Sequence, residues 1–138
     1  MVEPLDAPFA LVADDDFLVR TLAQTILEDA GFHALSAENG VEAIKVLEEH
    51  AASIVLLFTD VEMGPGGPDG FELARTTARR WPDISIVVAS GGVTPGIGDL
   101  PDGAVFIGKP FSAEVVHGHL DQILPDGRKP EPFKKRKR

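Results

Sequence analysis

Short apolar runs alternate along the chain with segments in which apolar residues recur at helical spacing. Five of the runs have the length of strands, and they cover residues 8–13, 32–37, 53–59, 84–89 and 104–108. The third is almost continuously apolar, which is typical of a strand in a parallel sheet that is covered on both faces. Strands that alternate with helices in this way predict an α/β fold with right-handed crossovers.

Capping signals mark where several of the intervening helices begin. Asn39 is followed three residues later by Glu42, Asp69 is followed by Glu72, and Ser112 precedes the last helix. Such side chains accept hydrogen bonds from the free N–H groups of a first helical turn. The third helix is expected to end near Arg80, before a Trp-Pro pair.

Apolar positions within each helix predict the face that it buries. For the first helix, which starts at Phe17 and ends before Gly31, the predicted stripe comprises Phe17, Leu18, Val19, Leu22, Ala23 and Ile26. For the second it comprises Val41, Ile44 and Leu47, and for the last it comprises Val116, Leu120 and Ile123.

The segment between the fourth and fifth strands, residues 91–103, should not form a helix. It holds two prolines and five glycines. Glycine in a helix interior costs about 1 kcal/mol and proline about 3 kcal/mol. We therefore predict a loop with at most one short turn, in which the helix expected between two parallel strands is degraded.

The composition describes one globular domain. The chain has 138 residues, 43% of them hydrophobic and 25% charged, and no cysteine. A disulfide framework and thiolate metal sites are thereby excluded. No apolar run is long enough to cross a bilayer and the acidic N-terminus is unlike a secretory signal, so we expect a cytoplasmic protein without membrane contact.

Charge is distributed unevenly. The net charge is −9, yet the last five residues are all basic; without them 8 basic and 22 acidic residues remain, a net charge of −14. An acidic body argues against a protein that wraps nucleic acid. We expect a folded domain over residues 1–124 and a basic, disordered tail over 125–138.

Polar or charged residues that can take part in catalysis or metal binding directly follow four of the five strands. Asp14 and Asp15 follow the first strand, Asp60 the third, Ser90 the fourth and Lys109 the fifth. Ligands of open α/β sheets bind beyond the carboxyl ends of the strands, where these side chains should converge. Taken singly, each has an ordinary explanation as a helix cap, a turn or a surface residue.

Together the five side chains suit the transfer of a phosphoryl group onto a carboxylate. Asp14 and Asp15 can hold a hard divalent cation such as Mg²⁺ through oxygen. Asp60 is then the candidate nucleophile, while Lys109 and Ser90 would bind phosphoryl oxygens.

Five short motifs, Val-Ala-Asp-Asp-Asp, Leu-Leu-Phe-Thr-Asp, Asp-Gly-Phe-Glu-Leu, Val-Val-Ala-Ser-Gly and Gly-Lys-Pro-Phe, occur in order along residues 8–124. In this order they resemble the receiver domain of bacterial two-component response regulators. The resemblance implies a flavodoxin-like, five-stranded parallel sheet of order 2-1-3-4-5. It also implies a signalling phosphoacceptor rather than an enzyme, which takes phosphate from a histidine kinase or a histidine phosphotransfer protein.

The resemblance further implies roles for individual residues. Asp60 would be the phosphoacceptor, and Mg²⁺ would be bound by Asp15, Asp60 and the backbone carbonyl of Glu62, with Asp14 acting mainly through metal-bound water. Ser90 and Phe106 would form the switch pair, and the Lys109–Pro110 peptide bond would be cis.

The chain departs from the usual pattern at two places. The loop after Asp60 is longer than is common, with Gly64 at a position where proline is usual, and Phe106 replaces the commoner tyrosine. Because little sequence follows the domain, we expect no DNA-binding domain, a downstream protein target, and a monomer or weak dimer.

Three other interpretations share parts of the pattern. A haloacid-dehalogenase-like phosphatase would use Asp14, the first acid of an Asp-x-Asp pair with Asp16, but leaves Asp60 unexplained. A flavodoxin-like binding module has the topology, but the acidic first loop would repel a flavin phosphate. The third is a receiver-like interaction module that is not phosphorylated. His117 and His119, two residues apart, point to different faces of a helix and do not predict a site.

Overall fold

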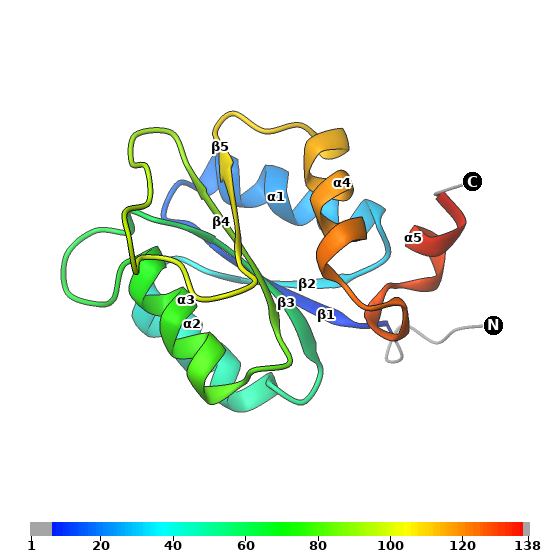
Figure 1. Cartoon of the computed structure of the whole chain (residues 1–138), viewed down its shortest axis with the longest axis horizontal. Coiled ribbons are helices and arrows are strands. Elements are labelled where there is room, and N and C mark those ends of the chain that lie inside the picture. Colours follow the sequence, from blue (N-terminus) through cyan, green and yellow to red (C-terminus); the bar gives the residue numbers. More distant parts are fainter. Residues whose placement is uncertain (1–6, 137–138) are drawn as a thin grey trace.

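The sheet is built from five parallel strands (Figure 1). The structure is a computed structural model that describes residues 7–136. The strands are β1 (Phe9–Ala13), β2 (His33–Ala37), β3 (Ile54–Asp60), β4 (Ser85–Ser90) and β5 (Val105–Gly108). Each end differs from the predicted run by at most one residue, and the order is β2-β1-β3-β4-β5, which confirms the predicted fold class.

Helices cover both faces of the sheet. The helices are α1 (Phe17–Asp29), α2 (Gly40–His50), α3 (Gly70–Arg80), α4 (Ala113–Ile123) and α5 (Glu131–Arg136), with a 3-10 turn η2 (Asp126–Arg128) before the last. In Figure 1, α1 and α4 lie on one side of the sheet, and α2 and α3 on the other. Each side has its own apolar core against the sheet. The central strand β3 is buried along its whole length, as its continuous apolar run predicted.

The predicted caps form as expected. The Asn39 and Ser112 side chains accept hydrogen bonds from the backbone N–H groups of Glu42 and Val115. Asp69 forms a complete capping box with Glu72. Each cap satisfies N–H groups that would otherwise lack partners at a helix start.

The buried stripe of α1 was predicted wrongly at its start. Phe17, Leu18 and Leu22 are 67%, 76% and 47% exposed, whereas Ala23 and Ile26 are buried together with Leu27. Successive helical residues are about 100° apart, so Ala23 and Leu27 lie at the centre of the buried face and Ile26 lies near its edge; Leu22 and Leu18 follow at steps of about 40° beyond Ile26 and fall outside that face.

The other two predicted stripes hold in part. In α2, Leu47 is buried and Ile44 packs against the core, but Val41 is 44% exposed. In α4, Val116 and Leu120 are buried, and the partly buried Ile123 packs against the core.

Residues 91–104 contain no helix, as predicted. Val93 and Leu100 pack against the core on the α3 side. Arg75 of α3 donates a hydrogen bond to the backbone oxygen of Asp99 at 2.9 Å. The loop is therefore held against this core by apolar contacts and to α3 itself by a hydrogen bond.

The described part of the C-terminal segment differs from the disorder that we expected after residue 124. It contains η2 and α5, and Phe133 is only 2% exposed. The charge run hides this single apolar anchor from a compositional analysis. Residues 137 and 138 lie outside the described part. Across residues 7–136, no helix combines the length and the apolar character that a membrane span requires.

Candidate metal centre

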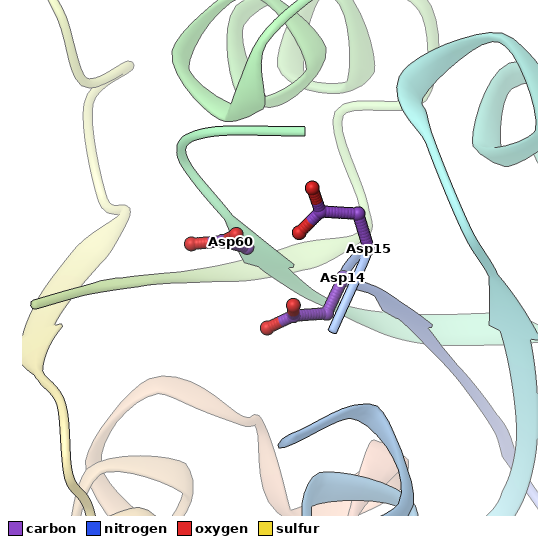
Figure 2. Close-up of side chains that lie close together, drawn as sticks. All are labelled: Asp14, Asp15 and Asp60. Carbon is purple, nitrogen blue, oxygen red and sulfur yellow. The ribbon is translucent and has the colours of Figure 1, made fainter. Parts of the chain in front are cut away.

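Three carboxylates meet at the carboxyl edge of the sheet. Because Ala13 of β1 pairs with Thr59 of β3, the residues that follow, Asp14 and Asp60, lie side by side. One carboxylate oxygen from each of Asp14, Asp15 and Asp60 lies within 4.8 Å of the other two. Figure 2 shows these side chains, with Asp14 and Asp15 on the segment after β1 and Asp60 at the end of β3. Asp14 and Asp60 are buried, and Asp15 is exposed.

The third acid of the run has a different role. The Asp16 side chain accepts hydrogen bonds from the N–H groups of Leu18 and Val19, so Asp16 is the N-cap of α1. Its own N–H donates to Asp14 Oδ1 at 2.9 Å, which holds the Asp14 carboxylate in the site. This cap was not predicted from the sequence, although an Asp directly before a helical run is a recognisable signal.

Lys109 bridges the two buried carboxylates. Its Nζ lies 3.0 Å from Asp14 Oδ2 and 3.0 Å from Asp60 Oδ1. The Lys109 N–H donates to the Ser90 carbonyl, and the peptide bond to Pro110 is cis. Lys109 follows β5, on the other side of β4 from β3, and its side chain reaches the ends of β1 and β3.

Burial dominates the electrostatics of Asp60. Burial raises the pKa of the Asp60 carboxyl and the neighbouring Asp14 raises it further, which outweighs the hydrogen bond from Lys109. For Lys109, burial acts to lower the pKa, but the contacts with Asp60 and Asp14 overcome this and raise it. The ammonium therefore stays charged, and Asp60 is a carboxylate whose charge is incompletely compensated.

The donor set fits a hard divalent cation. Three carboxylates face one ammonium, which leaves two negative charges uncompensated among these four side chains. Carboxylate oxygens are the ligands that Mg²⁺ and Ca²⁺ prefer. Arg20, which sequence reasoning missed, donates from Nη1 to the Asp14 backbone oxygen and leaves the carboxylate available.

The remaining predicted residues lie around this cluster. The Ser90 hydroxyl oxygen is buried and accepts hydrogen bonds from the N–H groups of Gly92 and Val93, so its own hydrogen is available to an acceptor. Phe106 lies on β5 opposite Val88 and packs toward the α2–α3 side. The exposed Glu62 has its Oε1 beside Gly92.

Two glycines bring the neighbouring backbone close to the site. The Gly70 N–H donates to the Val61 carbonyl at 2.7 Å, and a Cβ at residue 70 would lie 1.9 Å from the Asp60 carbonyl oxygen. At Gly40, a Cβ would lie 2.3 Å from the Pro68 oxygen. The long loop after Asp60 is therefore packed against the start of α2.

Comparisons with known proteins agree with this geometry. The family model described as response regulator receiver domain matches residues 10–121. The chain is 32% identical over 117 residues to the response regulator receiver protein CpdR of Brucella abortus, covering 83% of this chain and 94% of that protein. It is 33% identical to the chemotaxis protein CheY of Listeria monocytogenes, covering 81% and 94%.

A solved structure of a response regulator receiver protein from Sinorhizobium medicae superposes with a TM-score of 0.72 at 30% identity, covering 86% of this chain and 95% of that one. Other relatives are longer, and the chain matches only 22% of the NtrX-like response regulator of Rickettsia bellii. The acidic cluster, the lysine after β5 and the sheet order thus occur together in a chain that belongs to the response regulator receiver domain family of two-component signalling.

Proposed function

We propose that Asp60 accepts a phosphoryl group from a histidine kinase or a histidine phosphotransfer protein, and that the chain then signals through contacts with a downstream protein in the cytoplasm. The observation that carries the proposal is the Asp60 carboxylate, which is buried beside Asp14 and Asp15 and paired with Lys109 at 3.0 Å. It would act as a monomer or weak dimer. It is a signalling phosphoacceptor rather than an enzyme that turns over a substrate.

The transfer step is a displacement at phosphorus. An Asp60 carboxylate oxygen forms the new bond to phosphorus while the bond from phosphorus to the donor histidine nitrogen breaks. The nitrogen keeps the electron pair of the broken bond, and the ring leaves as neutral imidazole because its other nitrogen carries a proton. The product is an aspartyl phosphate on Asp60.

Lys109 and Ser90 would bind the phosphoryl oxygens. The Lys109 ammonium is already shared by Asp14 and Asp60, so it can pair with an oxygen attached to Asp60 by a short displacement. The hydroxyl hydrogen of Ser90 is available for a second oxygen because its oxygen accepts from Gly92 and Val93. A charge-assisted hydrogen bond of the first kind is roughly twice as strong as a neutral one.

Asp14, Asp15, Asp60 and the backbone carbonyl of Glu62 would hold Mg²⁺. The bound cation would neutralise charge on the transferring phosphoryl group. Asp14 is fixed for this by the N–H of Asp16, whereas Asp15 is free to adjust because it is exposed.

Ser90 and Phe106 would report the phosphorylated state. A shift of Ser90 toward the phosphoryl group would pull on the N–H groups of Gly92 and Val93, which begin the loop after β4. Phe106 lies two residues before the position opposite Ser90 on the neighbouring strand. Because Phe106 has no hydroxyl, it can respond only by repacking.

Incubation with a small phosphodonor and Mg²⁺, followed by intact-mass measurement, tests the proposal. We expect the mass of one phosphoryl group, labile to hydroxylamine, in the wild type and none in Asp60→Asn. Asp16→Asn is the matched control, since it removes a charge from the same acidic cluster region but keeps a competent N-cap. Two results would overturn the assignment. One is undiminished labelling of Asp60→Asn. The other is a wild-type protein whose phosphate maps to Asp14 and a variant Asp14→Asn that is no longer labelled.

A further inference from the structure

The chain folds back on itself after α4. It turns through η2, and residues 129–133 then lie against the C-terminal end of α1 and against α4. In Figure 1, α5 lies beside α4, close to the start of β1. This edge of the sheet is opposite the acidic cluster. Residues 129–133 are called the latch segment below.

Phe133 is the apolar anchor of the latch segment. It is 2% exposed and belongs to the core cluster that contains Leu27 of α1 and Leu120 of α4. Its ring packs edge-on against the ring of His117, with 5.7 Å between centroids. His117 Nε2 in turn lies 3.1 Å from the backbone oxygen of Ile26, so the three elements meet at one point.

The turn after α1 is shaped to accept the segment. Gly31 has a φ of +108°, a backbone conformation that favours glycine. A Cβ at residue 31 would lie 2.8 Å from Pro130 Cβ and 3.1 Å from Pro132 Cδ. Only a residue without a side chain allows the two prolines to approach so closely.

Lys129 fastens the other end of the latch segment. Its Nζ lies 3.1 Å from Asp121 Oδ1 of α4 and 2.9 Å from Asp126 Oδ1. Only 5% of its side chain is exposed, which is unusual for a lysine and reflects these two partners.

The link between α4 and the latch segment is tied mainly to itself and to the latch, because the Arg128 and Lys129 N–H groups donate to the Pro125 and Asp126 carbonyls and Asp126 pairs with Lys129. Residues 125–127 are exposed, and Arg128 approaches Asp83 only at 3.9 Å, with the Asp83 side chain 85% exposed. Segments with few buried contacts open at a lower free energy than the domain as a whole unfolds. The latch segment buries one aromatic side chain and one lysine, whereas the sheet and its four covering helices form two extensive cores.

We propose that residues 129–133 form a latch over the part of the apolar core where α1 meets α4, and that this latch opens locally, without unfolding of the sheet. In the closed state Phe133 is part of that core. In the open state Phe133 leaves the core, together with the basic residues that follow it in the sequence.

Limited trypsin digestion of the full chain measures the opening. Trypsin binds several extended residues on both sides of the bond that it cuts, and residues 129–133 can supply the C-terminal side for Arg128 only when the latch is open; the bond after Lys129 resists because proline follows. Cleavage after Arg80 in α3 reports unfolding of the domain in the same sample. In the wild type, we expect cleavage after Arg128 to be faster and to depend less steeply on urea than cleavage after Arg80, because local opening exposes less surface.

Removal of the anchor should open the latch selectively. Phe133→Ala should speed cleavage after Arg128 about 100-fold or more, in line with the loss of a buried aromatic ring, while cleavage after Arg80 changes far less. Phe17→Ala, which removes an aromatic ring that is 67% exposed, is the matched control and should leave cleavage after Arg128 unchanged. If Phe133→Ala does not fold, Lys129→Gln gives a milder test, with about tenfold faster cleavage expected.

Two results would overturn the latch. One is wild-type cleavage after Arg128 at the rate of a free peptide of residues 121–138, since the segment would then never be closed. The other is the same urea dependence for cleavage after Arg128 and after Arg80, since the segment would then open only when the domain unfolds.

Discussion

A single methyl group at residue 70 should disrupt the site through the backbone. A Cβ there would lie 1.9 Å from the Asp60 carbonyl oxygen, 2.7 Å from the Asp60 carbonyl carbon and 2.7 Å from Val61 Cα. All three are backbone atoms, so no rotamer change relieves the contact. Ordinary contact begins near 3.4 Å, which requires a separation of about 1.5 Å between the start of α3 and the end of β3.

Neither the end of β3 nor the start of α3 can move by this distance without a loss of stability. Asp60 ends the central strand and pairs with Ala89 of β4, and Gly70 is tied to Val61 by a 2.7 Å hydrogen bond. Overpacking of this kind costs typically 1–3 kcal/mol and occasionally more. We expect Gly70→Ala to lose about 3 kcal/mol in the free energy of unfolding and to lose most phosphorylation, because the Asp60 backbone must move.

Gly118→Ala is the matched control in urea unfolding followed by circular dichroism. Gly118 is exposed within α4 and has no atom within 4 Å of the position that a Cβ would take. Alanine there should stabilise the helix by about 1 kcal/mol. Both variants restrict the unfolded chain equally, so their difference of about 4 kcal/mol reports the folded state alone. A Gly70→Ala protein as stable as Gly118→Ala, with normal phosphorylation, would refute the close approach.

Three further outcomes are expected. Asp15→Ala should raise the Mg²⁺ concentration that phosphorylation requires at least about tenfold. It should stabilise the metal-free fold by about 1 kcal/mol or less, because Asp15 is exposed. Wild-type phosphorylation that is equally fast with Mg²⁺ and in excess chelator would contradict the metal role. The contacts with Asp126 and Asp121 raise the pKa of Lys129, so the stability that they contribute should be complete below about pH 10.5 and lost as pH rises through the raised pKa. Urea titrations of wild type and Lys129→Met should accordingly converge at high pH, and a constant difference would contradict it. Amide exchange in residues 91–102 should slow on phosphorylation, because Ser90 binds the start of that loop; unchanged exchange would contradict this ordering.

Strand positions and the polar residues that follow them were predictable because a strand that is buried on both faces leaves a short, nearly continuous apolar run in the sequence. The parallel order then fixes that Asp14, Asp60 and Lys109 meet at one edge, since each follows its strand directly. The absence of a helix in 91–104 was predictable for a local reason, because backbone penalties of glycine and proline add within a few residues.

The rotation of a helix about its own axis and the contacts between residues far apart in the sequence were not predictable. The stripe of α1 was misassigned because Leu22 and Ala23 both fit a helical period, and only packing against the sheet selects between them. The docking of Phe133 depends on Gly31, about a hundred residues earlier in the chain, where the space for two prolines leaves no periodic signal.

The acidic run after β1 shows how adjacent identical residues acquire different roles. Asp14 continues the strand direction and points into the site, where Lys109 reaches it at 3.0 Å. Asp16 lies at the first turn of α1, where its carboxylate binds two N–H groups of the helix instead of a cation. Between them, Asp15 remains exposed yet keeps one carboxylate oxygen within 4.8 Å of an oxygen of Asp14 and of Asp60. The chain thereby gathers negative charge at the proposed cation site without burying all of it, because the third acid is stabilised by the N–H groups of the helix start and the second is hydrated by solvent.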